Sequence, residues 1–233
     1  MEFIASALGS IPALFWGERA IAALGVRLVC DDYMLVIDDA DFDDAVQQLR
    51  SEGFQDWAWS YGSVDPSFYT GRLRENIYRR IVNDFSNLDR NSARFVFPLE
   101  QQKQPQHSTA KVALLPSSYA HICIRSALND TLTRDGNIIY PDGALLLQSF
   151  VQTLLREPVA GIWTSMLEMW AISYVYGELM LSDDTLDACD DEEAKAWFNE
   201  NIDRFGRGIV RITCTKRLGR VGYHESLASR GPA

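Results

Sequence analysis

One short run of apolar residues restricts the fold of this chain more than any other feature. Residues Tyr33 to Ile37 are continuously apolar, and aspartates stand on both sides of them, at Asp32 and Asp38. An apolar run of this length without alternation is typical of a strand that is buried on both faces, in a sheet covered by helices on each side. The run therefore predicts an α/β protein.

The flanking residues extend this pattern through the first half of the chain. Pro12 suits a first helical turn and Gly25 suits a stop, so we expect a helix over residues 11–24, with Gly17 either interrupting it or marking a loop before it. A second helix is expected after Asp41, which is placed to cap it, and Gly53 ends it. We also expect a helix over 72–85 and strands over 26–37, 57–59, 94–97, 111–115 and 121–124.

The second half of the chain has a helical pattern. Helices are predicted over 144–156, over 163–180 and, with acidic character, from residue 185 or 190 to residue 205. The 163–180 segment is apolar nearly all round, which indicates a buried helix. A last strand over 211–215 and a basic tail from Gly206 follow. We expect two regions: an α/β region over residues 1–135, and a helical region over 136–233 that packs on it and ends in the basic tail.

Composition excludes several classes of function. The formal net charge of −10 and the pI of about 4.8 argue against broad nucleic-acid binding, since an acidic surface repels phosphates. No apolar run approaches the ~18 residues that a membrane span needs. The first residues carry no basic segment before their apolar stretch, so we expect no signal peptide and a soluble, cytoplasmic protein. The four cysteines are far apart and are expected to be free thiols.

The segment from Trp16 to Gly25 carries the clearest motif (Trp16-Gly17-Glu18-Arg19-Ala20-Ile21-Ala22-Ala23-Leu24-Gly25), and it leads into Asp31-Asp32 and the apolar run. A helix with a closing Leu-x-x-x-Gly-Phe pattern follows, from Leu49 to Phe54. Between Leu14 and Trp59 the chain resembles the nucleotidyltransferase-fold superfamily, especially its antitoxin/toxin-like and minimal members. Its general layout is also similar to that of fungal proteins without an assigned substrate.

The resemblance implies a mixed sheet flanked by helices, followed by a helical C-terminal half. It also implies a helix start rich in small residues that offers N–H groups to phosphates, and two carboxylates on alternate strand positions that hold Mg²⁺. This chain departs from that pattern. Glu18 replaces the second small residue, and Asp31 or Asp32 would be followed at the alternate position by Tyr33 or Met34. We therefore expect an incomplete metal site and no cofactor, with Mg²⁺ held by Asp31 and Asp32 as the alternative.

Three further residues are candidates for ligand binding, beside Gly17, Glu18, Asp31 and Asp32. His121 stands next to an expected strand and could be a base or a ligand, although a hydrogen-bonded structural histidine explains it equally simply. Lys216 and Arg217 form the best anion-binding pair, and the alternative is that they balance the acidic helix before them. The acidic residues 183–193 are expected to complement a helix dipole.

These observations favour a pseudoenzyme. We expect a nucleotidyltransferase-fold protein that binds a small-molecule ligand or another protein without ordinary nucleotidyl transfer. One alternative is an active transferase with a rearranged carboxylate site, for which the 111–124 segment offers no acid. Another is an oligomeric interaction module, a homo-oligomer that uses the apolar 163–180 helix. Whether the chain is an enzyme stays open at this stage.

Overall fold

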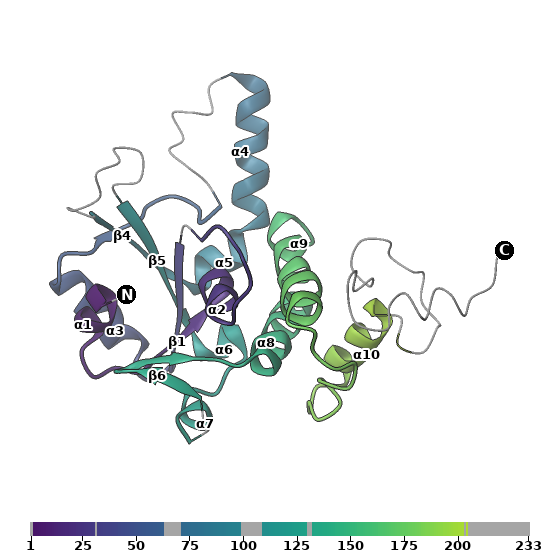
Figure 1. Ribbon diagram of the computed structural model, residues 1–233. Helices are drawn as coiled ribbons and strands as arrows, with labels where there is room; N and C mark the ends of the chain where they lie inside the picture. Colours follow the sequence, from purple (N-terminus) through teal and green to yellow (C-terminus); the bar gives the residue numbers. More distant parts are fainter. Residues whose placement is uncertain are drawn as a thin grey trace.

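The computed structural model describes residues 2–30, 32–62, 71–98, 109–129, 132–202 and 204. It confirms the predicted α/β class: a mixed sheet lies between helices (Figure 1). Helices α1 and α3 lie on one side of this sheet, and α8 and α9 lie on the other. Helix α4 projects away from the remainder of the chain.

Seven strands of the described part of the chain form one sheet, in the order β3-β4-β5-β2-β1-β7-β6. The pairs β2–β5 and β1–β7 are parallel and the other pairs are antiparallel. The strands are β1 (Ala13–Trp16), β2 (Asp32–Ile37), β3 (Gln55–Asp56), β4 (Ala93–Pro98), β5 (Thr109–Pro116), β6 (Thr133–Asp135) and β7 (Ile138–Tyr140).

Strand β2 is the central strand that the apolar run predicts. Its residues from Met34 to Ile37 are at most 2% exposed, and side chains of both faces are covered because successive residues point to opposite sides. On one face Leu35 lies above α3, and on the other Met34 pairs in register with Trp16 of β1. Burial on both faces explains why β2 shows no polar alternation.

The helices surround the sheet in chain order. They are α1 (Glu2–Leu8), α2 (Gly17–Ala23), α3 (Phe42–Ser51), α4 (Arg72–Asp84), α5 (Ser86–Asn91), α6 (Ser117–Ala120), α7 (Ile124–Asn129), α8 (Gly143–Arg156), α9 (Ile162–Glu168), the π-helix η2 (Met169–Glu178) and α10 (Glu192–Asn201). The predicted helices over 72–85 and 144–156 are confirmed as α4 and α8. The helix after Asp41 is confirmed as α3, although the Asp41 side chain makes no capping hydrogen bond.

Three of the secondary-structure predictions are wrong. The first half of the 11–24 helix is strand β1, because Ala13–Trp16 pairs with β2 on one side and with β7 on the other; the helix begins only at Gly17. The 121–124 strand is absent: His121 has a left-handed backbone (φ 54°) between α6 and α7. The strand placed at 57–59 lies earlier, at Gln55–Asp56.

The apolar 163–180 helix runs as α9 followed by η2, and it forms the centre of the core. Trp163 and Trp170 are at most 1% exposed and their rings lie 5.5 Å apart. Trp16 of β1 contacts both of them, and its indole N–H donates to Ser149 Oγ of α8 at 2.8 Å. These tryptophans are therefore packed inside this chain, whereas Met169 is 38% exposed.

Two other expectations concern particular parts of the chain. The 211–215 strand lies outside the described residues, as does most of the basic tail. In the ranges that are described, no helix is both long enough and apolar enough to span a bilayer.

Candidate functional site

The turn from β1 into α2 places Gly17 and Glu18 at the edge of the sheet. Gly17 has a left-handed backbone (φ +67°) and is buried. A Cβ atom there would lie 2.8 Å from Met34 Sδ and 3.5 Å from the Trp170 ring. Glycine is therefore needed both for the backbone conformation and for the close approach of β2 and η2.

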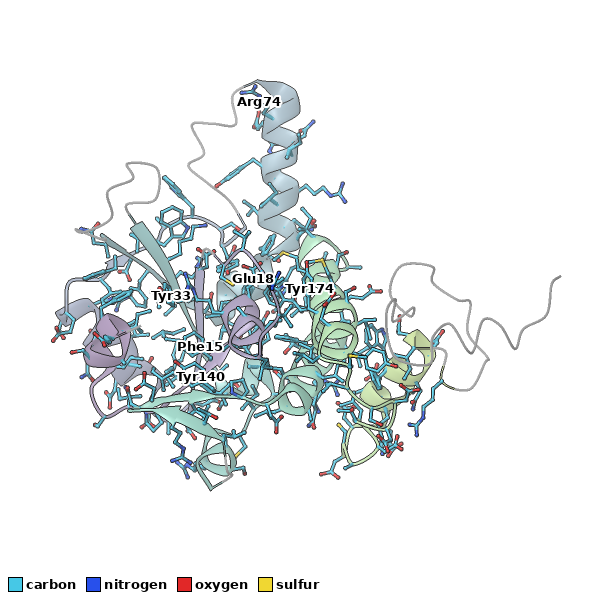
Figure 2. The ribbon with its side chains drawn as sticks, in the orientation of Figure 1. Phe15, Glu18, Tyr33, Arg74, Tyr140 and Tyr174 are labelled. Atoms are coloured by element: carbon cyan, nitrogen blue, oxygen red, sulfur yellow. The ribbon has the colours of Figure 1, made fainter. Side chains whose placement is uncertain are left out.

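Glu18 occupies the first turn of α2, and α2 packs against η2. Figure 2 shows Glu18 beside Tyr174, which lies on η2. Glu18 is half-buried. A carboxylate at this place presents negative charge where the resemblance would place a phosphate.

Asp32 begins β2, and its neighbour in the parallel strand β5 is Lys111. The two side chains lie on the same face, and the Lys111 Nζ atom is 3.8 Å from Asp32 Oδ2. The side chains are only 19% exposed for Asp32 and 27% for Lys111, so water screens this ion pair less than it screens a surface pair. The parallel register of two strands that are distant in sequence thus places an ammonium beside the candidate metal ligand.

Aromatic side chains from the segment after β3 surround Lys111. Its Nζ atom lies 5.3 Å from the ring centre of Trp57 and 5.9 Å from that of Tyr61. Both distances are within the range of a cation–π interaction. Asp32, Lys111, Trp57 and Tyr61 together are called the Lys111 cluster below.

Tyr61 connects the cluster to both acids. Burial raises the pKa of the Tyr61 hydroxyl well above its ordinary value, and the negative charges of Asp32 and Glu18 raise it further, together with a hydrogen bond to the Asp32 side chain. The phenol therefore stays protonated and donates to the Asp32 carboxylate. It acts as a hydrogen-bond donor here and not as a base.

Arg19 fixes the start of β2 from the other side. Its guanidinium donates to the backbone carbonyls of Asp32 and Cys30, each at 3.0 Å, and lies 3.7 Å from the centre of the Tyr33 ring. These contacts attach the segment before β2 to α2. Arg19 is thus a positioning residue for Asp32.

The side chains of this site do not fit a magnesium ion. Mg²⁺ requires hard oxygen ligands in near-octahedral arrangement, but an ammonium stands beside Asp32. The alternate strand position carries Met34, which is 2% exposed and has its sulfur against Gly17. In the described ranges, no group of three or more His, Cys, Asp or Glu side chains is arranged to hold a metal ion.

The remaining predicted site residues are not part of the cluster. His121 follows the opposite end of β5 from Lys111 and caps α6. Burial lowers the pKa of its imidazole, and the charge of Arg156 lowers it further, against an opposing effect of Asp191. Asp31, Lys216 and Arg217 lie outside the described residues.

The structure thus brings together Gly17, Glu18 and Asp32, and it adds residues that sequence reasoning missed. Lys111 stands at the polar start of a predicted strand, which was the only signal for it. Trp57 and Tyr61 lie near a segment interpreted as a strand, and nothing in the sequence connected them with Asp32. Comparison with known protein families finds no family that matches the chain, and comparison with curated proteins finds none that matches it either. The nucleotidyltransferase resemblance therefore stays a prediction.

Proposed function

We propose that this protein is a binding module with a nucleotidyltransferase-like fold that has given up metal-dependent nucleotidyl transfer. The observation that supports the proposal is the Lys111 ammonium, 3.8 Å from the Asp32 carboxylate. In this proposal the lysine takes the place that a metal ion would need, and the chain acts through binding of a small molecule or partner.

The electrostatic cost of a metal at this place is large. A divalent cation about 4 Å from the ammonium would be repelled by about 8 kcal/mol at an effective dielectric constant of about 20. Asp32 already balances Lys111 and accepts the Tyr61 hydroxyl, so its attraction for a second cation is reduced. Met34 supplies a soft thioether, which hard cations do not select.

The proposal is tested first on the wild-type chain. We expect no incorporation of nucleotide from ATP, GTP, CTP or UTP into protein or small acceptors, with Mg²⁺ or with Mn²⁺. We also expect no metal-dependent rise in melting temperature. A metal-dependent product, or a rise in melting temperature that requires metal and one nucleotide, would contradict the proposal.

A variant separates loss of the site from its occupation by lysine. Lys111→Ala removes the ammonium while Asp32, Glu18 and Tyr61 remain, so we expect Mn²⁺ to raise the melting temperature of this variant only. Lys195→Ala is the matched control, because Lys195 forms an ion pair with Glu192 on α10. A double variant Lys111→Ala/Asp32→Asn should lose the effect of Mn²⁺ again.

A further inference from the structure

A cavity that shares no residue with the Lys111 cluster opens beside the end of α2. Its volume is about 490 Å³, within the range of roughly 300–1,000 Å³ that is usual for small-molecule sites. It is lined by the end of α2 (Ala23, Leu24), the start of β6 (Leu132, Thr133) and the residues at the end of β7 (Tyr140, Asp142).

One wall of the cavity is apolar and fixed in place. The Tyr140 ring is stacked on the Phe15 ring, with 5.1 Å between ring centres and 22° between planes, and Figure 2 shows the two side chains together. Leu24 and Leu132 add aliphatic surface. Such a wall suits a flat or compact apolar group.

The charged groups around the cavity are acidic. Asp142 lies in its lining, and its Oδ1 atom accepts the backbone N–H of Leu145 at 2.8 Å, which caps α8. A carboxylate has a second oxygen that can accept from a ligand. The end of α2 adds the partial negative charge of a helix C-terminus.

Strand β6 reinforces this sign. Asp135 lies two residues after Thr133 and therefore on the same face of the strand. Burial raises the pKa of the Tyr140 hydroxyl, and the charge of Asp135 raises it further. Arg134 lies on the opposite face, where its guanidinium donates to the Ala127 carbonyl.

We propose that this cavity binds an organic ammonium ion with a small apolar or aromatic body. The body packs on Tyr140 and Leu24, and the ammonium lies at Asp142. The inference rests on the proposed function for the expectation that the chain acts by binding. It reverses the charge of ligand that the nucleotidyltransferase resemblance would imply.

Two probes of equal ring and chain length test the charge preference. Phenethylamine and 3-phenylpropionate differ only in the ionic group, and their dissociation constants are compared by two-dimensional NMR titration of the full chain. We expect phenethylamine to bind at least about tenfold more tightly, which corresponds to roughly 1.4 kcal/mol. The proposal is wrong if phenethylamine causes no shifts at millimolar concentration, or if the carboxylate binds as tightly.

Variants identify the place of binding. Asp142→Asn removes the charge, and asparagine caps helices as well as aspartate does, so we expect the preference for the amine to disappear while the fold remains. Ala23→Phe fills the cavity and should weaken the binding of phenethylamine at least tenfold. Asp184→Asn, on an exposed acid elsewhere, should leave both probes unchanged. Unaltered phenethylamine binding in Ala23→Phe would overturn the proposal, while the Mn²⁺ experiments on Lys111 would keep their meaning.

Discussion

The start of α9 depends on a close contact that a single methyl group would break. Asp84 is 6% exposed, and its Oδ2 atom accepts the backbone N–H of Ile162 at 3.1 Å. A Cβ atom on Gly161 would lie 2.5 Å from Asp84 Cγ and 2.7–2.8 Å from both carboxylate oxygens. Because the Gly161 backbone is extended (φ −172°), the contact and not the conformation excludes a side chain.

The size of the effect follows from what the Asp84 carboxylate must give up. In Gly161→Ala it has to rotate away, which removes the cap at a cost of about 0.5–2 kcal/mol. It also leaves a buried acid with fewer partners, at a cost of about 1–3 kcal/mol. Only the exposed Arg80, 3.7 Å away, stays within ion-pair distance. We expect the free energy of unfolding to fall by roughly 2–4 kcal/mol, taking these two costs together.

A double-mutant cycle measured by urea unfolding tests this reasoning. Asp84→Ala removes the cap and also the obstacle, so Gly161→Ala on that background should cost less than about 0.5 kcal/mol. The Thr164 side chain, which bonds the Gly161 backbone, remains in all variants. The reasoning is refuted if Gly161→Ala alone costs less than about 0.5 kcal/mol, or if the two substitutions are additive.

Three further predictions concern stability. Ser149→Ala should cost about 1–3 kcal/mol in urea unfolding, because it leaves the buried Trp16 indole N–H without its acceptor; an unchanged urea midpoint would contradict this. Gly17→Ala should cost at least about 1–2 kcal/mol for its left-handed backbone, with the Met34 sulfur adding to it; a stabilised variant would show that this backbone is not strained. Burial opposes the shift, but hydrogen bonds from the α10 backbone and the charge of Arg156 lower the pKa of Asp191, so its contribution is present above about pH 4 and is lost as pH falls further. Melting temperatures should therefore fall less steeply between about pH 4 and 2 in Asp191→Asn than in the wild type.

The sequence was informative where local pattern and burial agree. The Tyr33–Ile37 run could only be a fully covered strand, and α8 shows both its cap at Asp142 and its apolar face in the sequence. The segment Ala13–Trp16 was misjudged because four apolar residues fit a helix turn and a strand equally well. Its strand character comes from hydrogen bonds to β2 and β7, which lie far along the chain.

The candidate site was only half accessible from the sequence. The motif identified Gly17, Glu18 and Asp32, whose relation is local. Lys111 reaches Asp32 through the parallel register of β2 and β5, and no pattern within either segment encodes that register. The π-helical geometry of η2 was also beyond sequence reasoning, because π-helices are rare and have no distinct periodicity.

The pairing of β1 with β7 has a consequence for how the chain matures during synthesis. Trp16 and its hydrogen-bond partner Ser149 are 133 positions apart. At translation rates of about 5–20 residues per second, Trp16 waits roughly 7 to 27 s for that partner to be made. Throughout this interval one side of β1 offers unpaired backbone groups and a large indole to any neighbouring nascent chain. The amino-terminal half of the polypeptide is therefore the part that most needs chaperone protection before release from the ribosome.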